Sequence, residues 1–350
     1  MDHQIKCTIV MYHYIRNMYE TDYPNIKGLL IKKFIGQLNY LQRNYIVIRL
    51  EDYIEFLHGN KNIPNNACIL TFDDGFKDHY LNVFPMLKNR KLPASFFPIT
   101  QPLTEFVVPA VHKTHFLLAK IGSRALADEF NQILKRQFAK LVKGFFVDEK
   151  VKKERKYRWD DVLTANLKWA IATIPFSPKV KMLNQIFAEY FENEKEFCKE
   201  LYMSWDEMRE MMEEGMSFGS HTHTHPTLSQ LAIKEQIKEL KGSKEILEKK
   251  LKAKIKLFSY PYGSFDRTVI EILRKQKCIC GLTTDAGINA GNHFPDLLYL
   301  SPSQFQRNRQ TVTRISSRHS PQLMGVPTRM CVLLRAQDGI ERAMIHHTRL

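Results

Sequence analysis

Residues 67–75 read Ala-Cys-Ile-Leu-Thr-Phe-Asp-Asp-Gly, an apolar run of strand length that ends in two aspartates and a glycine. Asn65 and Asn66 precede this run and favour a break in the chain at that point. A helix-like segment follows at 78–90, and a second apolar run at 94–99 completes a β–α–β unit. Units of this kind favour a largely parallel sheet with its helices outside.

Short apolar runs alternate with helix-period segments on both sides of this unit, so we expect an α/β fold. The other expected strands lie at 7–12, 45–48, 216–220, 257–260 and 278–283, the last being the final strand. The other expected helices lie at 31–43, 51–58, 204–215, 229–251 and 266–276. The apolar residues of the helix at 229–251 are expected to face inward, namely Ile233, Ile237, Leu240, Leu247 and Leu251.

The segment at 103–203 differs from the rest because its apolar residues follow helical spacing and no convincing strand interrupts them. We interpret it as a helical insertion, a lid or subdomain rather than a separate catalytic unit. The expected division is therefore 1–102 and 204–302 for the two parts of the α/β domain, 103–203 for the insertion, and 303–350 for an Arg-rich tail. The tail could be a basic interaction arm, a poorly ordered extension, or sequence from a shifted reading frame.

The chain of 350 residues carries 52 basic and 37 acidic residues, which gives a net charge of +15. Residues 301–350 hold eight Arg and no Lys against Asp338 and Glu341, so +6 of this excess lies beyond the motifs described below. The hypothesis of a basic nucleic-acid-binding protein would rest on this charge alone, so we expect no specific nucleic-acid partner.

The sequence contains no apolar stretch of transmembrane length, and its first residues lack the apolar core of a secretory signal. Six cysteines are too few for a disulfide framework in a chain of this size. We therefore expect a cytoplasmic protein with reduced thiols, and we leave open peripheral contact with the inner membrane face.

Asp73 and Asp74 follow a predicted parallel strand, so their side chains are expected at the rim of the sheet. A strand-to-loop turn is the alternative interpretation of Asp-Asp-Gly. His221, His223 and His225 follow another short strand within five residues, and imidazole is the commonest ligand of zinc and related ions. A polar loop is the alternative there.

One carboxylate and two histidines leave positions open on a divalent ion, which is typical of a catalytic metal site. Two adjacent aspartates permit one of them to bind the ion and the other to accept a proton from water. The sequence therefore predicts metal-assisted hydrolysis.

Residues 71–75, Thr-Phe-Asp-Asp-Gly, together with His221-Thr-x-x-His225-Pro226, resemble the polysaccharide deacetylase family, which is carbohydrate esterase family four. Residues 258–263, Phe-Ser-Tyr-Pro-Tyr-Gly, resemble the family's third motif in its Phe-x-Tyr-Pro-Tyr-Gly variant. The Met-Tyr-His-Tyr sequence at 11–14 is similar to the N-terminal strand of many bacterial members.

The resemblance implies an irregular (β/α) barrel of about seven strands, interrupted here by the helical insertion. It implies that Asp73 is the general base and that Asp74, His221 and His225 hold a divalent metal, with zinc as our first choice. It also implies an oxyanion contact from the backbone N–H of Tyr262. The substrate-binding residues it implies are Tyr260, Pro261 and Gly263.

The implied activity is removal of an acetyl group from an N-acetylated sugar or saccharide, a lipid-linked precursor included. Two departures from the family pattern bear on this activity. Ser259 replaces the arginine that tethers the catalytic aspartate, and no Leu-x-His sequence marks the general acid. The acid is therefore unassigned: His293 is the nearest candidate by order, and the weaker candidates are His13, His79 and His223. The alternatives are an O-acetyl sugar esterase and a degenerate, non-catalytic glycan-binding protein.

Overall fold

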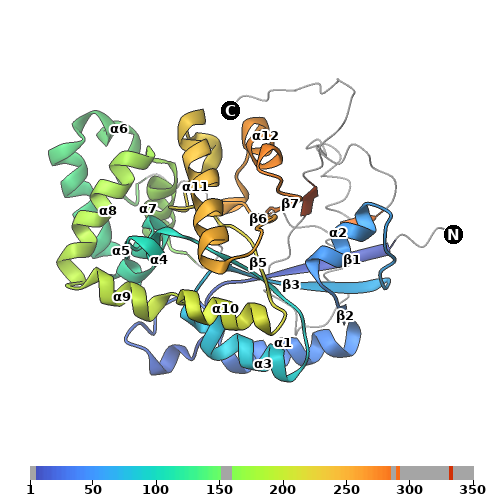
Figure 1. Ribbon diagram of the computed structural model, residues 1–350. Coiled ribbons are helices and arrows are strands. Elements are labelled where there is room, and N and C mark those ends of the chain that lie inside the picture. The colour runs from blue at the N-terminus through green and yellow to red at the C-terminus, as the bar shows by residue number, and fades with distance from the viewer. Residues whose placement is uncertain (1–4, 151–159, 285–288, 292–330, 334–350) are drawn as a thin grey trace.

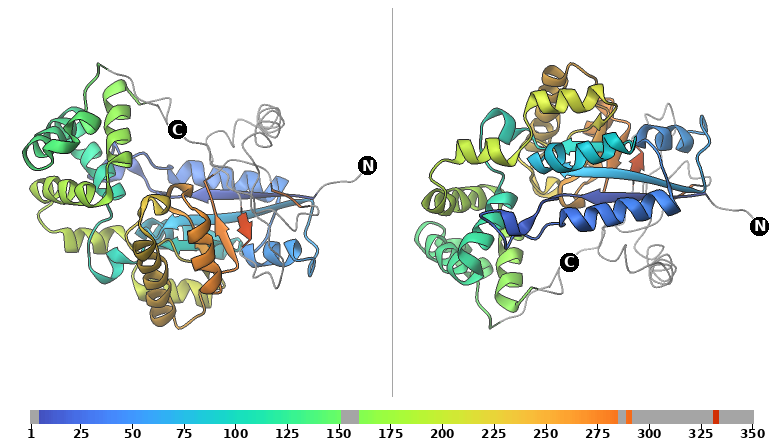
Figure 2. Two further views of the ribbon diagram at one scale, coloured as in Figure 1. Left: turned by 90° about the horizontal axis from the view of Figure 1, so that it is seen from above. Right: turned by 90° about the horizontal axis from the view of Figure 1, so that it is seen from below.

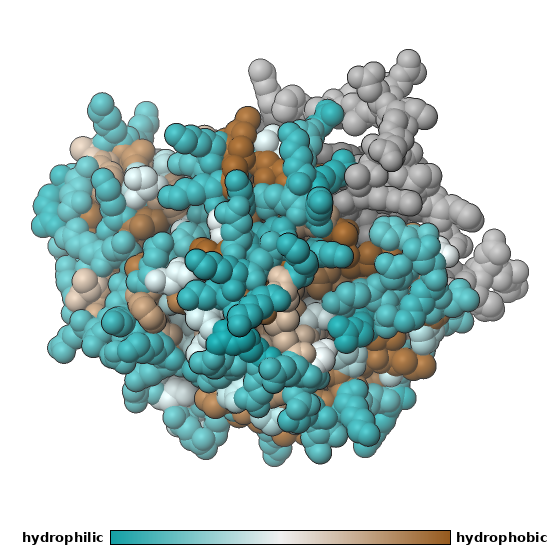
Figure 3. All heavy atoms as spheres, in the orientation of Figure 1, coloured by the Kyte–Doolittle hydropathy of each residue, from teal (hydrophilic) through white to brown (hydrophobic). Residues whose placement is uncertain are grey.

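The computed structural model describes residues 5–150, 160–284, 289–291 and 331–333, and all structural statements below refer to these residues. They form a mixed α/β fold with a largely parallel sheet at its centre, as the sequence predicts (Figure 1). Polar side chains cover most of the face drawn in Figure 3.

The main sheet has six described strands in the order β5-β4-β3-β1-β8, with β2 pairing the first part of β3. The pairs β1–β3, β2–β3, β3–β4 and β4–β5 are parallel, and β8 runs antiparallel to β1. Their bounds are β1 Ile5–Tyr12, β2 Ile46–Val47, β3 Asn66–Asp74, β4 Ser95–Pro98, β5 Ser217–Phe218 and β8 Asn289–Gly291.

A second described sheet, in the order β6-β7-β9, continues from the end of β5. Ser220 makes the connection, because its N–H donates to the Leu257 carbonyl at 2.9 Å and its carbonyl accepts from the Ser259 N–H at 3.0 Å. The bounds of these strands are β6 Leu257–Ser259, β7 Cys280–Leu282 and β9 Cys331–Leu333.

The central strands of the main sheet are mostly apolar because their side chains are buried. Phe72 of β3 is fully buried, and its ring stacks between Tyr12 of β1 at 5.2 Å and Phe96 of β4 at 4.8 Å. Phe97 and Phe218 are buried as well, so these phenylalanines belong to the core. A parallel strand that is covered on both faces requires such an uninterrupted apolar run.

The helices of the α/β body cover the strands, with α1 and α3 below the sheet and α11 and α12 above it in Figure 1. Their bounds are α1 Ile31–Asn44, α2 Leu50–Leu57, α3 Phe84–Asn89, α10 Trp205–Glu213, α11 Ile233–Leu251 and α12 Arg267–Lys275. Short 3-10 turns lie at Met18–Glu20, Leu228–Gln230 and Pro261–Gly263.

The segment 103–203 is helical in its described part and has a hydrophobic cluster that is largely its own. It lies beyond the carboxyl ends of β1 and β3, on the side away from the N-terminus (Figures 1 and 2). Its elements, with the helix just before it, are α4 Gln101–Thr104, α5 Ala110–Gln137, a 3-10 turn at Ala139–Leu141, α6 Val142–Phe145, α7 Val162–Thr173, α8 Phe176–Tyr190 and α9 Glu194–Leu201.

Two predictions about strands and helices are wrong in detail. The segment 278–283 is not the final strand, because β8 and β9 follow it, and β9 lies within the predicted tail. The predicted helix at 78–90 begins as a π-helix at His79–Val83 before α3 continues it.

The prediction of the buried face of α11 is also wrong in part. Ile233 and Ile237 are 59% and 42% exposed, whereas the three predicted leucines are buried. Gln236 and Glu239 take inward positions instead, because each bonds to a neighbouring loop. A buried polar side chain is tolerated where its hydrogen bonds are satisfied. The spacing of apolar residues alone therefore does not predict which face of α11 is buried.

No helix among the described residues is long and apolar enough to cross a membrane.

Candidate metal centre

Asp73 and Asp74 are the last two residues of β3, so the strand continues two residues beyond its predicted apolar run. Both carboxylates are buried, with 2% and 4% exposure. Asp74 has a φ of 75° and Gly75 a φ of 76°, which turns the chain sharply at the sheet rim. A side chain at position 75 would meet the Cβ of Pro98 at 2.7 Å, so only glycine fits there.

His221 and His225 lie in the loop that follows β5, and both are buried. The segment 221–225 is not helical, and His225 has a left-handed φ of 59°. Glu239 of α11 holds this loop by accepting the N–H of His223 at 3.0 Å and the N–H of Thr224 at 2.8 Å. The Thr224 hydroxyl donates to the other oxygen of Glu239 at 2.6 Å. The two histidines therefore stand on a restrained loop.

Asp74, His221 and His225 come together as a possible metal site, with one ligand atom of each within 4.8 Å of the others. The Nε2 atoms of His221 and His225 lie 3.5 and 3.7 Å from Oδ1 of Asp74. His221 Nδ1 lies 2.7 Å from the Ser259 carbonyl, which can only accept, so this nitrogen carries the proton. The lone pair of His221 is thereby left on Nε2, which faces Asp74.

The donor set fits a divalent ion. Asp74 Oδ1 is buried and has no hydrogen-bond partner among the described residues. Burial, and then the neighbouring His221, hold the pKa of His225 well below its usual range, so its imidazole stays neutral. Burial alone would raise the pKa of Asp74, but the surrounding histidines, His112 foremost, hold that pKa well below its usual range. A carboxylate and neutral imidazoles are suitable ligands for zinc and its neighbours.

Asp73 lies beside this cluster and is held by Ser259. The Ser259 hydroxyl donates to Oδ2 of Asp73 at 3.1 Å, and both side chains are buried. The residue that replaces the family's arginine therefore supplies a tether itself.

Residues 260–263 border the site from the second sheet. The ring of Tyr262 lies 4.8 Å from the ring of His225 in an edge-on arrangement and is 39% exposed. The side chains of Tyr260 and Pro261 are buried, with Tyr260 stacked on Phe265 at 4.7 Å. Tyr262 is therefore the side chain of this motif that reaches the surface next to the three proposed metal ligands.

The other candidate histidines that the structure describes are not members of the three-ligand cluster, but His13 lies near enough to interact electrostatically with Asp74 and His225. His79 is fully buried and lies 2.9 Å from the His13 carbonyl through Nε2. His223 lies 2.9 Å from the Thr100 hydroxyl and 3.0 Å from Glu105. His293 lies outside the described residues.

One site residue was missed by sequence reasoning, namely His112 of α5. It is 1% exposed, and its Nε2 lies 3.2 Å from Oδ2 of Asp74. No motif surrounds it, and the pair of histidines at 112 and 115 near the start of a helix was the available signal.

Comparisons with known proteins agree with this geometry. The profile of the family described as "Polysaccharide deacetylase" matches residues 60–136 and 121–278, which together span more than half of the chain. A putative polysaccharide deacetylase of Bacillus subtilis, YxkH, is 28% identical over 86 residues, or 25% of this chain and 31% of that protein. The poly-beta-1,6-N-acetyl-D-glucosamine N-deacetylase of Escherichia coli K12 is 36% identical over 64 residues, or 18% of this chain and 10% of that protein.

The matched regions therefore cover less than a third of either relative. Among solved structures, the Streptococcus pyogenes deacetylase PplD in complex with acetate superposes with a TM-score of 0.50 at 19% identity. The superposition covers 87% of this chain and 98% of PplD, and at this identity it shows a shared fold. The profile match extends from the segment before β3 to the end of α12 and so includes both aspartates and both histidines. The chain belongs to the polysaccharide deacetylase family.

Proposed function

We propose that this protein is a metal-dependent hydrolase that removes the acetyl group from an N-acetylated sugar or saccharide. The observation that carries the proposal is the convergence of Asp74, His221 and His225, with Asp73 beside them on the same strand. These residues come from segments 147 positions apart and meet at one edge of the sheet. Family membership and the similarity of this chain to the E. coli N-deacetylase support the amide as the bond that is cleaved.

Asp74, His221 and His225 would hold the ion, and zinc is our first choice because two of the ligands are neutral imidazoles. When bound, the ion would supply Lewis acidity toward an amide carbonyl and toward water. Three protein ligands would leave coordination positions of such an ion open for the reacting groups.

Asp73 would act as general base and take up a proton from the attacking water, and a general acid to which no residue is assigned would protonate the leaving amine. The Ser259 hydroxyl engages Oδ2 of Asp73 and fixes the orientation of the carboxylate. The backbone N–H of Tyr262 would donate to the oxyanion, and the substrate would pass along residues 260–263. The left-handed φ of Tyr262, 58°, turns the chain beside the ring of His225.

The same comparisons support an irregular (β/α) barrel of about seven strands as the finer description of the fold. The Ser220–Phe258 bridge, which joins the two sheets into a longer series of neighbouring strands, agrees with that proposal. Residues 1–102 and 204–302 would form the barrel, 103–203 the insertion, and 303–350 an atypical tail.

We further propose a cytoplasmic location, with peripheral contact at the inner membrane face if the saccharide is lipid-linked. The side chains of Cys7, Cys68, Cys198, Cys278 and Cys280 are buried thiols, which suits a reducing compartment.

The test is metal analysis of the purified protein coupled to an acetate-release screen over N-acetylated and O-acetylated saccharides. We expect about one divalent ion per chain and acetate release from N-acetylated substrates that stops after chelation and returns with added zinc. Release of acetate from O-acetyl esters alone would show that the protein is an O-acetyl sugar esterase instead. Binding of saccharides without release, whichever metal is added, would replace the proposal with the degenerate glycan-binding protein.

A further inference from the structure

The helical insertion contributes two residues next to the proposed metal ligands. They are His112 at the start of α5 and Tyr202 just after α9. His112 Nε2 lies 3.2 Å from Oδ2 of Asp74, whereas His221 and His225 approach Oδ1. The two oxygens of this carboxylate therefore face different partners. Oδ1 faces the proposed ion, and Oδ2 faces the insertion.

Tyr202 determines how His112 presents its ring. The Tyr202 hydroxyl lies 2.6 Å from Nδ1 of His112. Oδ2 of the ionised Asp74 can only accept, so the Nε2 atom of His112 that faces it carries the N–H. Nδ1 then accepts from the Tyr202 hydroxyl, which keeps its proton because burial raises the pKa of Tyr202 well above its usual range. The opposite tautomer would aim a lone pair at the carboxylate.

The contact is built into the backbone on both sides. The Met203 N–H donates to the Gly75 carbonyl at 3.0 Å, and Phe76 pairs with Tyr202 in an antiparallel bridge. The ring of Phe76 contacts the rings of His112 at 4.8 Å and Tyr202 at 5.8 Å. The residues that follow Asp74 are thus fastened to the segment that carries Tyr202.

Burying the imidazole of His112 and the hydroxyl of Tyr202 costs folding free energy unless both groups form hydrogen bonds. His112 and Tyr202 are 1% and 2% exposed, and a buried imidazole and a buried hydroxyl both require hydrogen-bond partners. An apolar pair would dock the insertion equally well. Carboxylates that bind a metal are commonly held by a further hydrogen bond from behind, which restricts their orientation.

We propose that His112 and Tyr202 are positioning residues, through which the helical insertion holds Asp74 so that only Oδ1 is offered to the ion. The inference rests on the proposed function, since it takes Asp74 as a metal ligand. It assigns the insertion a part in the site itself, in addition to any part in substrate binding.

The experiment compares metal affinity in wild type, His112→Leu, His112→Gln and Tyr202→Phe. Affinity for Zn²⁺ is measured by competition with a chromogenic chelator, and the Co²⁺-loaded proteins are compared by visible absorption. His112→Leu is expected to lose roughly 10- to 100-fold in affinity. His112→Gln, whose amide can still donate, is expected to recover part of that loss, and Tyr202→Phe to lose less than His112→Leu. The Co²⁺ spectrum should change in the variants that lose affinity.

His115→Gln is the matched control, because His115 lies one turn along α5, at 5.9 Å from His112 between ring centroids, and its Nδ1 lies 3.3 Å from the Tyr14 hydroxyl. Its affinity should stay within about twofold of wild type, and a larger loss would mean that disturbing α5 suffices. Unchanged affinity and an unchanged Co²⁺ spectrum in both His112→Gln and Tyr202→Phe would overturn the inference, even if His112→Leu does not fold. A wild-type protein that binds no divalent ion would instead overturn the proposed function.

Discussion

Ser259 contacts Asp73 and His221 at the same time. Its hydroxyl donates to Asp73 Oδ2 at 3.1 Å, and its carbonyl accepts from His221 Nδ1 at 2.7 Å. One residue of β6 therefore orients both the proposed base and one proposed metal ligand. The two contacts use different atoms, so substitution can remove the first and keep the second.

Ser259→Ala is expected to lower the rate of acetate release and to leave metal content unchanged. It removes a hydrogen bond to a carboxylate, which contributes about 1.5–3 kcal/mol, or roughly 10- to 100-fold in rate if it acts in the transition state. Ser259→Thr keeps the hydroxyl and should stay close to wild type. Steady-state kinetics and metal analysis of the two variants measure this, and equal rates would show that the hydroxyl does not orient Asp73.

Asp73→Asn and Asp74→Asn should fail in different ways. The first should retain the ion and lose roughly 10²- to 10⁴-fold in turnover, because an amide cannot accept the proton. The second should lose the ion, since it removes the anionic ligand of the cluster. Metal content and acetate release, measured on the same preparations, separate the two. Full turnover of Asp73→Asn with metal bound would contradict the assignment of the base.

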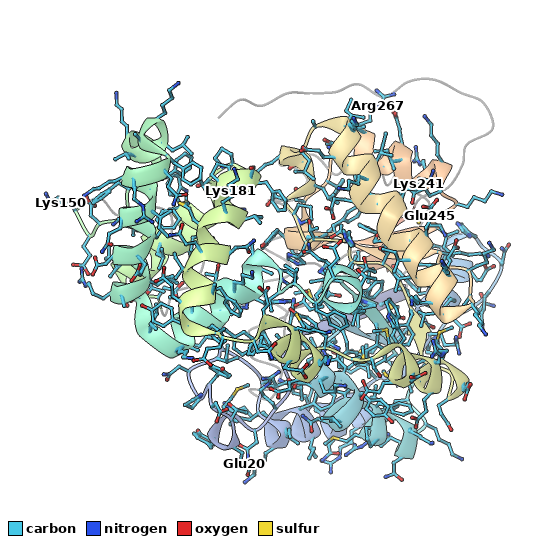
Figure 4. All side chains as sticks on the ribbon, turned by 60° about the vertical axis from the view of Figure 1, so that its left-hand side comes forward. Glu20, Lys150, Lys181, Lys241, Glu245 and Arg267 are labelled. Atoms are coloured by element: carbon cyan, nitrogen blue, oxygen red, sulfur yellow. The ribbon has the colours of Figure 1, made fainter. Side chains whose placement is uncertain are left out.

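Glu239→Gln should loosen the loop that carries the two histidines and weaken metal binding. Glu239 accepts from two backbone N–H groups and one hydroxyl of that loop, and bonds to a charged acceptor are worth about 1.5–3 kcal/mol each. The matched control on the same helix is Glu245→Gln. Glu245 projects outward beside Lys241, 3.7 Å away, and is exposed (Figure 4). Competition titration with Zn²⁺ should show a loss for the first variant and none for the second.

Gly75→Ala should destabilise the fold by about 1–3 kcal/mol, because it adds a Cβ 2.7 Å from Pro98 at a φ of 76°. Gly36→Ala is the control, since nothing lies within 4 Å of the added atom in α1. Alanine inside a helix is favoured over glycine by about 1 kcal/mol, so this variant should be more stable than wild type. The midpoint of denaturant unfolding should fall in Gly75→Ala and rise in Gly36→Ala. A shift of both midpoints in the same direction would contradict the packing described at Pro98.

Acid should destabilise the metal-free protein partly through His79. Burial lowers the pKa of His79 from 6.5 to about 4. Between these values the unfolded state binds the extra proton, so stability falls as the pH drops from about 6.5 toward 4 and is fully present above 6.5. The contribution is about 3 kcal/mol across this window. Unfolding of wild type and His79→Gln from pH 7.5 to 4 should give a flatter profile for the variant, and parallel profiles would exclude His79 as a source.

The central part of the fold follows from the sequence because it depends on local pattern. The apolar runs around Phe72 and Phe96 predicted two parallel neighbours, and the structure confirms that pairing. The cluster of Asp74, His221 and His225 was predicted from residue types at strand ends, and the structure brings the three together. Parallel strands deliver their carboxyl ends to one edge, so order along the chain suffices for such a site.

The features that the sequence did not predict depend on contacts that produce no periodic pattern of residues in the sequence. His112 contacts Asp74 across 38 positions of sequence, and apart from the nearby His115 nothing in the sequence distinguishes it from an ordinary buried histidine. The double contact of Ser259 uses its backbone carbonyl, which any residue would provide. Ile237 was misplaced because Glu239 takes an inward position on that helix for its bonds to the loop.

Asp74, His225 and Tyr262 all adopt a left-handed backbone, which is unfavourable for residues other than glycine by roughly 1 kcal/mol or more at each position. Glycine at any of the three would relieve this backbone strain, but at positions 74 and 225 it would also remove a proposed metal ligand and the buried contacts of its side chain. The unfavourable backbone conformation is therefore the cost of placing these side chains at the site. A directed-evolution campaign on this scaffold would have to hold these three positions constant and seek its stability gains elsewhere.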